Sequence, residues 1–323
     1  MLSIIKLFIL EQTGASDILE CEVVQELWSG FGQIIRVQLI GAPMASVIVK
    51  NIDLRNSKEH PRGWDTNASF KRKKFSYQVE QNWYENYSKQ SDSSIRVAKH
   101  LGSVTGEHNS MILLEDLDAS GFSIRKSSLN IEETKTCIQW LANFHGRFMG
   151  REPEGLWDVG TYWHLATRSD EFKAMKDSEL KRKAFKLDEL LNGCKFKTIV
   201  HGDAKVANFC FSKNVSKVAA VDFQYVGGGC GMKDVVYLMG SCLSSSECQE
   251  YVNELIRFYF ECLKSALAKN GNQLDFKLLE VEWRFMFKIA WADFSRFLQG
   301  WMPSNSKLNS FDKQIVRRAL ESA

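Results

Sequence analysis

Two short stretches of this chain place acidic and amide side chains at a fixed spacing. Residues 201–208 read HGDAKVAN, and residues 222–224, which begin 14 positions after Asn208, read DFQ. Transfer of a phosphoryl group needs a carboxylate to accept the proton of the attacking hydroxyl, together with oxygen ligands that hold Mg²⁺ against the nucleotide phosphates. We therefore predict Asp203 as the catalytic base, and Asn208 and Asp222 as the metal ligands.

The frame of the two stretches matches that of a kinase catalytic loop. In protein kinases, the catalytic loop has the pattern H-R-D-x-x-x-x-N and is followed by D-F-G. The alternative is that HGD is a turn and that DF caps a strand end, since each pattern alone is common. Both patterns together favour the chemical interpretation. Apolar segments flank them, TIV before the loop, NFCF after it and VAAV before Asp222. We therefore expect the polar groups at the ends of buried strands.

The upstream half offers a glycine turn and a strand lysine, which a kinase-type site also needs. Gly30, Phe31 and Gly32 form a G-x-G turn ahead of an alternating strand. Glycines there let backbone N–H groups approach phosphate oxygens, although a simple hairpin is the alternative. Lys50 ends the strand-like run ASVIVK and is predicted to bind the α- and β-phosphates, unless it merely ends a strand at the surface.

A helix and a strand end complete the predicted nucleotide site. Apolar residues recur at helical spacing in FSYQVEQNWYENYSKQ, which puts Glu80 beside the buried stripe and within reach of the strand lysine. Glu85 is the rival, but it lies off the stripe. Further on, MILLEDLDASGF is an apolar strand that breaks into acidic residues. We expect backbone groups near Glu115, Asp116 and Leu117 to bind adenine there, and an ordinary strand-to-turn transition is the alternative.

Taken in order along the chain, these motifs resemble the aminoglycoside phosphotransferase and choline kinase superfamily. More specifically, they look like its ecdysteroid-kinase-like (CHK kinase-like) branch, in which HPRGW, TYWHLATR, VHGDAKxANFCFS and VDFQYVGGGCGMKD recur. The resemblance spans roughly residues 15–300. It implies an α+β, bilobal protein-kinase-like fold with a small β-rich N-lobe in residues 1–117. The larger, mostly helical C-lobe would occupy residues 118–323.

The resemblance also implies an activity. It predicts a phosphotransferase that uses ATP and Mg²⁺ to phosphorylate a hydroxyl of a small molecule, a steroid-, choline- or aminoglycoside-like alcohol. Lys205 matches a lysine that meets the γ-phosphate in serine/threonine kinases, and is therefore a second catalytic candidate, although it could simply be surface exposed. Gln224 departs from the DFG pattern, so the glycine-dependent flip of protein kinases is not carried over to this chain.

Three other segments carry charge or glycine. The polar stretch of residues 51–74, with HPRGW inside it, either folds over the nucleotide or the acceptor or is a surface excursion. Within it, we interpret Lys71–Lys74 as the solvated entry to a helix. The glycines of residues 227–231 predict a loop that lines the acceptor site. Asp234 is expected to stabilise the start of an apolar helix, and in related phosphotransferases an aspartate here also steadies the catalytic loop.

Length and composition fit a protein with two lobes. The chain has 323 residues, is 44% hydrophobic and carries a formal net charge of +3, which does not indicate binding to nucleic acid. Eight cysteines show no zinc spacing, so we predict reduced thiols and a cytoplasmic location. The apolar start MLSIIKLFIL is too short to span a bilayer, and we expect a helix docked on the N-lobe; a targeting segment is the alternative.

The acceptor is the part of the function on which the sequence says least. TYWHLATR lies near the acceptor or packs at a helix edge, and His145 reads as a core or cleft-wall histidine. A late helix carries an aromatic stripe that is core or acceptor wall, with Asp293 as a counter-charge for a cationic acceptor. The stripe consists of Trp283, Phe285, Phe287, Trp291, Phe294, Phe297 and Trp301. Hydrophobic or amine-bearing alcohols are therefore the candidates.

Two other functions remain open from the sequence. One is a catalytically silent nucleotide-binding pseudokinase or scaffold built on the same fold. The other is transfer of the nucleotidyl group instead of the γ-phosphate. The sequence predicts a small-molecule alcohol as partner, no nucleic acid and no stable membrane insertion, and it makes no prediction of the oligomeric state.

Overall fold

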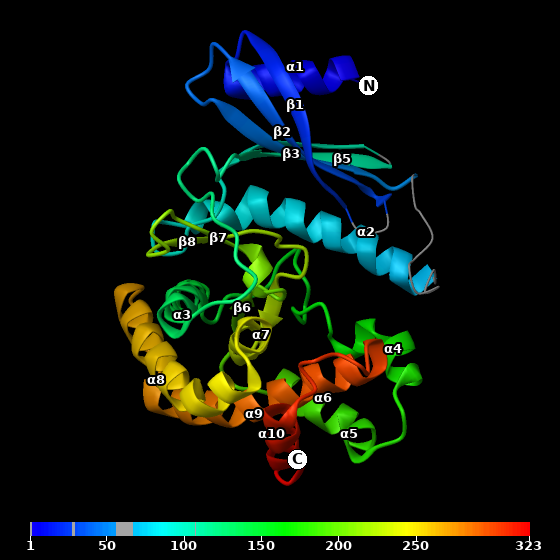
Figure 1. The fold of residues 1–323 in the computed structure, drawn as a ribbon, viewed down its shortest axis with the longest axis vertical. Helices are drawn as coiled ribbons and strands as arrows, with labels where there is room; N and C mark the ends of the chain where they lie inside the picture. Colours follow the sequence, from blue (N-terminus) through cyan, green and yellow to red (C-terminus); the bar gives the residue numbers. More distant parts are fainter. Residues whose placement is uncertain (1, 28–29, 56–66, 107) are drawn as a thin grey trace.

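The computed structural model describes residues 2–27, 30–55, 67–106 and 108–323. Within them, a five-stranded sheet and a larger group of helices lie at opposite ends of the molecule (Figure 1). The α+β fold with a small β-rich N-lobe and a mostly helical C-lobe, predicted from the sequence, is confirmed. The HPRGW segment, predicted to cover the site or to form a surface excursion, lies outside the described residues.

The central strand of the N-lobe sheet carries Lys50. The strands are β1 (Asp17–Glu26), β2 (Gly32–Ile40), β3 (Ser46–Asp53), β4 (His100–Thr105) and β5 (Asn109–Glu115). Their order is β1-β2-β3-β5-β4, and all neighbours are antiparallel. Side chains alternate between faces along a strand, so Val49 faces one side and Ile48 and Lys50 the other. Lys50 pairs with Ile34 on β2 and with Ile112 on β5, which fixes its register from both sides.

Helix α1 (Leu2–Thr13) covers the outer face of the sheet. Ile5, Phe8 and Ile9 pack there on a small apolar cluster that contains Val37, Val47, Val49, Met111 and Leu113. The docked helix predicted for the apolar start of the chain is therefore confirmed. In the described part of the chain, no helix combines the length and the apolar character that crossing a membrane requires.

Helix α2 (Asn67–Asn82) runs between the sheet and the C-lobe (Figure 1). It continues into a π-helical turn, Trp83–Tyr87, a local widening that is frequent at functional sites. The ring of Phe223 stacks on Trp83 with 4.6 Å between centroids, and its centroid lies 4.7 Å from that of the His201 ring. This column of rings ties the end of α2 to the catalytic loop, so the helix and the loop are positioned together.

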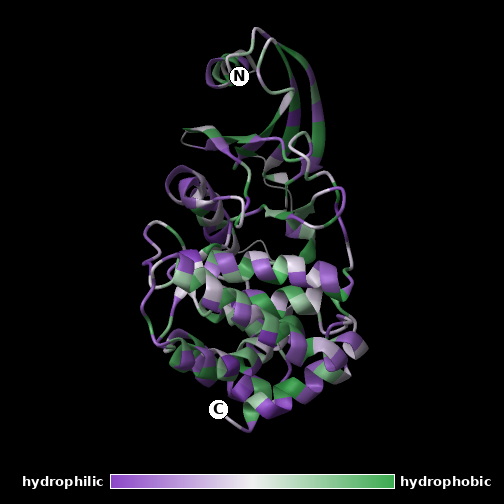
Figure 2. Cartoon of the chain, turned by 90° about the vertical axis from the view of Figure 1, so that its left-hand side faces the viewer, coloured by the Kyte–Doolittle hydropathy of each residue, from purple (hydrophilic) through white to green (hydrophobic). Residues whose placement is uncertain are grey.

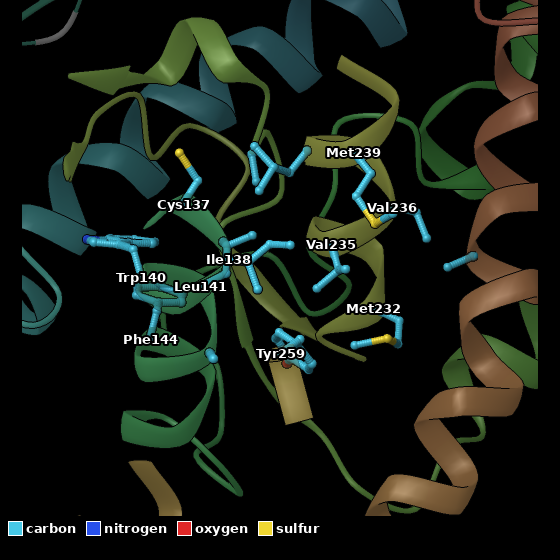
Figure 3. Close-up of a cluster of buried hydrophobic side chains, with 14 of the residues drawn as sticks. Cys137, Ile138, Trp140, Leu141, Phe144, Met232, Val235, Val236, Met239 and Tyr259 are labelled. Atoms are coloured by element: carbon cyan, nitrogen blue, oxygen red, sulfur yellow. The ribbon is translucent and has the colours of Figure 1, made fainter. Parts of the chain in front are cut away.

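The C-lobe is built from amphipathic helices around one apolar core. The helices are α3 (Ile131–Arg147), α4 (Ser169–Ala174), α5 (Glu179–Arg182), α6 (Ala184–Asn192), α7 (Met232–Cys242), α8 (Ser245–Lys269), α9 (Phe276–Trp301) and α10 (Ser310–Leu320). Hydrophilic and hydrophobic residues alternate along them (Figure 2). Figure 3 shows α3 and α7 facing each other across the core, for example through Leu141 and Val235, with Tyr259 of α8 beside them. Capping boxes at Asn130 and Ser244 begin α3 and α8.

Two short antiparallel strand pairs carry the catalytic motifs. Strand β6 (Thr198–Val200) pairs with β9 (Gly227–Gly229), and β7 (Phe209–Phe211) pairs with β8 (Val218–Ala220). The strands expected around the polar motifs are therefore confirmed. The interpretation of residues 227–231 as a loop lining the acceptor site is wrong. Gly227–Gly229 is a buried strand, and a Cβ at Gly227 would meet the Trp157 carbonyl oxygen at 2.1 Å, so the glycines there permit close backbone packing.

Candidate active site

A cleft of about 1100 Å³ is formed by residues of the sheet, of helix α2 and of the C-lobe. Its lining includes every residue predicted for the site except Gly30 and Gly32. The predicted residues that line it are Phe31, Lys50, Glu80, Glu115, Asp116, Leu117, Asp203, Lys205, Asn208 and Asp222. Folding thus brings into one cleft groups that lie in six separate segments of the chain.

Asp203 is a buried carboxylate with one oxygen engaged and the other unpaired. Its Oδ2 accepts hydrogen bonds from Lys205 Nζ and from Asn208 Nδ2, each at 3.0 Å. Its Oδ1 is buried and has no hydrogen-bond partner among the described residues. Burial raises the pKa of Asp203, and the charge of Lys205 opposes that shift. An unpaired oxygen on a carboxyl group of raised pKa suits a group that must accept a proton.

The catalytic loop is held from behind by Asp234. Its Oδ2 accepts from the His201 N–H at 2.6 Å, and its Oδ1 accepts from the Gly202 N–H at 2.9 Å. His145 Nε2 lies 3.1 Å from the same carboxylate inside the core. Gly202 has φ +79°, and a Cβ there would lie 1.9 Å from the Tyr225 carbonyl oxygen, so only glycine fits. Of the two roles considered for Asp234, its hydrogen bonds show the one known from related phosphotransferases, steadying of the catalytic loop, and no described side chain caps the start of helix α7.

Asp222 stands in a strained backbone conformation at the end of the second motif. Its φ is +67°, a region that residues other than glycine seldom adopt and that is often found at functional sites. Its buried Oδ1 has no hydrogen bond among the described residues and lies 3.5 Å from Lys50 Nζ. Burial alone would raise the pKa of Asp222, but the charges of Lys50 and Lys205 outweigh it and lower that pKa.

The oxygen atoms around these motifs fit a magnesium ion. Asn208 uses its Nδ2 to bond both the Oδ2 and the backbone oxygen of Asp203, so its amide oxygen is left for a cation. Together with Asp222, it would supply two protein ligands. That is the pattern expected for Mg²⁺, which is usually held by one or two carboxylates together with substrate phosphates.

Lys50 and Glu80 form a buried ion pair. Lys50 Nζ lies 2.5 Å from Glu80 Oε2, and both side chains are almost fully enclosed. Burial lowers the pKa of Lys50, but the charges of Glu80 and Asp222 outweigh burial and raise it, so the ammonium group stays charged. The rival glutamate, Glu85, instead accepts a hydrogen bond from Gln81 on its own helix. Strand β3 and helix α2 therefore hold the charged Lys50 side chain in a fixed position in the cleft.

In the glycine turn between β1 and β2, Phe31 is the residue of the described part, 30–32, that lines the cleft. Gly30 has φ +72° and Gly32 has φ +138°. A Cβ at Gly32 would meet the Asn51 carbonyl oxygen at 2.0 Å, so the turn packs too tightly for a side chain. Phe31 is buried beside Tyr77, with 6.4 Å between their rings. The two residues before Gly30 lie outside the described residues.

The predicted adenine-binding segment follows β5. The Glu115 N–H donates to the Lys99 carbonyl oxygen at 2.9 Å, and the Leu117 carbonyl oxygen accepts from the Phe122 N–H at 2.8 Å. Leu117 lines the cleft, and its N–H forms no hydrogen bond with any described residue. The Asp116 side chain is engaged elsewhere, because its Oδ2 accepts from Arg36 Nε at 2.8 Å. The binding of adenine by backbone groups of this segment stays a prediction.

Further aromatic and basic residues line the cleft, among them members of TYWHLATR and of the aromatic stripe, both of which the sequence analysis considered as parts of an acceptor site. They are Arg72, Lys73, Tyr162, Arg168, Tyr225, Tyr237, Phe297 and Trp301. The interpretation of Lys71–Lys74 as a solvated helix entry is wrong for its two middle residues. Lys73 Nζ donates to Gln224 Oε1 at 2.6 Å, and Arg72 Nη1 donates to the Thr167 carbonyl oxygen at 2.7 Å. The seven-residue spacing from Lys73 to Glu80, two helical turns, was the available signal.

Asp293 is not available as a counter-charge for a cationic acceptor. Its Oδ1 accepts from Arg296 Nε at 2.8 Å, and its Oδ2 accepts from Trp163 Nε1 at 3.1 Å. Most of the aromatic stripe of α9 is core, and only Phe297 and Trp301 reach the cleft. The interpretation of the stripe as core is therefore right for the residues before Phe297.

Comparisons with protein families agree with the motifs. The model of the ecdysteroid kinase-like family matches residues 33–152. A second family model, described as uncharacterized oxidoreductase dhs-27, matches residues 164–307. No curated protein matches the sequence.

Solved structures with similar folds include several small-molecule kinases. The ethanolamine kinase of Plasmodium vivax aligns with a TM-score of 0.51 at 10% identity, over 93% of this chain and 82% of that chain. A putative fructosamine-3-kinase from Haemophilus somnus gives 0.46 at 12% identity, over 98% and 96%. Aminoglycoside phosphotransferase APH(3'')-Id from Streptomyces rimosus gives 0.41 at 13% identity, over 83% and 92%. The first of these similarities supports the kinase-like fold, and at this identity it supports the fold alone.

Proposed function

The chain is identified with the ecdysteroid-kinase-like branch of the small-molecule kinases, and we propose that it is an ATP- and Mg²⁺-dependent phosphotransferase acting on a hydroxyl of a small molecule. The observation that carries the proposal is the arrangement around Asp203. An unpaired carboxylate oxygen there shares one cleft with Asp222, whose own Oδ1 has no hydrogen bond, and with the Lys50–Glu80 ion pair. Buried unpaired oxygens are costly unless a ligand or cation completes them.

In the proposed mechanism, Asp203 orients the acceptor alcohol and takes its proton. Its free Oδ1 accepts the hydroxyl hydrogen, while Lys205 and Asn208 hold Oδ2 and so fix the orientation of the carboxylate. Asp234 keeps the loop in place through two backbone N–H groups. Holding the alcohol at this point turns a bimolecular encounter into a reaction between positioned groups, which is a large part of the rate gain in phosphoryl transfer.

The nucleotide is bound by groups from both lobes. Lys50, held by Glu80, contributes a fixed positive charge for the phosphates, and the free Leu117 N–H contributes a donor for the adenine edge. Asn208 and Asp222 would hold Mg²⁺, which supplies charge neutralisation at the transferred phosphate. Lys205, which lies half exposed beside the base, adds a second cation on the acceptor side of that phosphate.

The geometry favours this proposal over its rivals. A silent nucleotide-binding scaffold is the alternative, but a pseudokinase has no need of an unpaired buried base. The oxidoreductase description of one family model finds no counterpart in the fold. Residues 164–307, all of them described, form helices and antiparallel strand pairs. Dinucleotide cofactors in the doubly wound fold bind instead at the carboxyl ends of parallel strands.

The proposal is tested by a screen that couples ADP release to a detector across a panel of alcohols. An acceptor that raises ADP release above the rate with ATP and Mg²⁺ alone is expected. Mass spectrometry of its product should show the gain of one phosphoryl group. The gain of an adenylyl group would assign nucleotidyl transfer instead. Nucleotide binding without release of ADP for any acceptor would favour the silent scaffold.

We also infer a cytosolic setting for the enzyme. The eight cysteines, all of them within the described residues, are free thiols, and only Cys21 is fully exposed. Buried thiols of this kind suit a reducing compartment.

A further inference from the structure

Two arginines, Arg72 and Arg168, line the cleft beside the rings of Tyr162 and Phe297, a region that we call the acceptor end of the cleft. Arg72 comes from helix α2, and Arg168 immediately precedes helix α4. Arg168 Nη1 binds Glu171 Oε1 at 2.9 Å, and its Cζ lies 5.6 Å from the centre of the Tyr162 ring. Among the described residues, Arg72 donates to the Thr167 carbonyl oxygen at 2.7 Å and to the Ser69 hydroxyl at 3.2 Å.

A wall of tyrosines connects these arginines to the catalytic base. The ring of Tyr162 lies 5.9 Å from that of Tyr225 and 5.4 Å from that of Tyr237. Burial, and then the charge of Asp203, raise the pKa of Tyr162, which places this ring near the base. Burial, and then the positive charge of Arg168, lower the pKa of Arg72, which indicates electrostatic repulsion between the two guanidinium groups. A flat molecule along this wall would therefore have Asp203 at one end and the arginines at the other.

The negative charges of the cleft are already engaged at other positions. The carboxylates that line it are Glu80, Glu115, Asp116, Asp118, Asp203 and Asp222. Arg36 and Arg96 bind the three carboxylates beside the adenine segment, and Lys50 binds Glu80. No described carboxylate forms an ion pair with Arg72 or with Lys73, the next residue along the helix. Glu171 pairs with Arg168, so among the described residues Arg72 and Lys73 add positive charge to this part of the cleft without a carboxylate in an ion pair with them.

We propose that the acceptor alcohol carries an oxyanion, such as a carboxylate or a sulfate, that Arg72 binds with the support of Arg168. This inference rests on the proposed phosphotransferase function and narrows its substrate. A guanidinium group presents paired N–H donors that match an oxyanion, and such hydrogen bonds are stronger than neutral ones. Aromatic walls from Tyr162, Phe297 and Trp301 accommodate the body of the molecule. An amine-bearing acceptor would instead place its charge against two arginines.

Three matched probes test the charge of the acceptor. They are 4-(hydroxymethyl)benzoate, its neutral amide and 4-(hydroxymethyl)benzylamine, which share one ring and one primary alcohol. Coupled ADP release gives kcat/KM for each, and calorimetry gives its binding in the absence of ATP. We expect the benzoate to exceed the amide by roughly ten- to a hundredfold, the worth of a hydrogen bond between charged groups. The amine should be the poorest of the three.

Variants of one helix separate recognition from stability. Arg72→Gln should abolish the preference for the benzoate over the amide and leave the KM for ATP unchanged. Arg72→Lys, which keeps the charge, should retain part of the preference. Lys74→Gln is the matched control, because Lys74 is exposed on the same helix and does not line the cleft. A purely structural clamp from α2 to Thr167 would instead lower activity on all three probes equally.

The outcomes distinguish this inference from the function on which it rests. Benzoate binding that Arg72→Gln removes supports the inference even if no probe is phosphorylated. Turnover of the amide or the amine at the same rate as the benzoate overturns the inference and leaves the phosphotransferase standing. Failure of the benzoate to bind at millimolar concentration, or a rise in the KM for ATP as the main effect of Arg72→Gln, also overturns it.

Discussion

At the scale of single residues, the site shifts the pKa values of two neighbouring carboxyl groups, Asp203 and Asp222, in opposite directions. Both are buried, and burial alone would raise both pKa values. Burial prevails for Asp203, while Lys50 and Lys205 together reverse the shift for Asp222. Pairs of titratable groups with opposite shifts commonly divide the roles of proton acceptor and charged ligand. The structure is consistent with that division here.

The pH dependence of turnover should report the environment of Asp203. The base acts in its ionised form, so kcat/KM should fall as the pH drops through its pKa, and this limb should lie above the ordinary aspartate value of 3.8. Lys205→Ala removes a charge that lowers the pKa of Asp203, so the limb should move to higher pH. Lys205→Arg keeps the charge and serves as control. A limb that stays in place in Lys205→Ala would contradict the assignment.

The site residues that could be predicted from the sequence are those that belong to short local motifs. Asp203, Asn208 and Asp222 were predicted from spacing alone, and the structure gathers them in one cleft, although their roles stay predictions. Tyr225 and Tyr237 were missed. They meet Tyr162 only because strand β9 and helix α7 turn back across the catalytic loop. No periodicity along the chain indicates such a meeting, since it depends on tertiary packing.

At the scale of elements, helix α2 connects most parts of the site. Its final turns carry Glu80 to Lys50, and its earlier turns carry Lys73 to Gln224 and Arg72 to Thr167. Gln224 in place of the glycine of a DFG motif thus has a structural consequence, because its amide oxygen anchors the helix. The ion pair and the acceptor end of the cleft therefore depend on the position of one helix.

Gly300 should be needed for the packing of α9 against α4. A Cβ at Gly300 would lie 1.9 Å from the Glu171 carbonyl oxygen, so Gly300→Ala must displace α4 and with it Arg168. We expect a loss of about 1–3 kcal/mol of unfolding free energy, the usual cost of overpacking. Thermal or urea denaturation measures it. Acceptor kcat/KM should fall more than the affinity for ATP.

A second glycine provides the control for that change. Gly240 lies within α7, and a Cβ there would meet its nearest neighbour, Trp291, at 3.9 Å, which is ordinary contact. Gly240→Ala should be neutral or stabilising, since alanine favours helix over glycine by about 1 kcal/mol. Equal stability of Gly300→Ala and the parent protein would refute the packing argument.

Strands and helices with a clear apolar periodicity were predicted well. Segments defined by a run of glycines or of charges were not, because such runs occur in more than one kind of structure. The strand of Lys50, the docked first helix and the strands around the motifs follow from apolar periodicity. The glycines of residues 227–231 were misread, because a glycine run indicates freedom of the backbone equally in a loop and in a tightly packed strand. Arg72 and Lys73 were misread because they contact Thr167 and Gln224 of the C-lobe, where an isolated helix would have faced solvent.

At the scale of the whole molecule, the site exists only where the two lobes meet. The sheet supplies Lys50, helix α2 supplies Glu80, and the C-lobe supplies Asp203 and Asp222. The proposed boundary at residue 117 falls between β5 and α3, and it stays a prediction. The bilobal fold could be predicted from the order of motifs. The charge and shape of the acceptor end could not, since its residues come from segments on both sides of the cleft.

Binding of ATP with Mg²⁺ should stabilise the protein across the lobes. A ligand at a hundred times its Kd adds about 2.7 kcal/mol to the unfolding free energy, which a thermal-shift titration detects. The shift should shrink when EDTA removes the metal. It should shrink similarly in Asp222→Asn, which keeps the size of the side chain and loses its charge. An identical shift with and without metal would argue against a magnesium site formed by Asn208 and Asp222.

The proposal that Asp203 accepts the proton of an acceptor alcohol is tested most directly by Asp203→Asn. The acceptor-dependent release of ADP and the thermal shift produced by ATP and Mg²⁺ are measured on this variant and on the parent. Our account predicts a fall in turnover of roughly 10²- to 10⁴-fold, the usual worth of a positioned general base, with a nearly unchanged shift. Acceptor-dependent ADP release at the parental rate would contradict it.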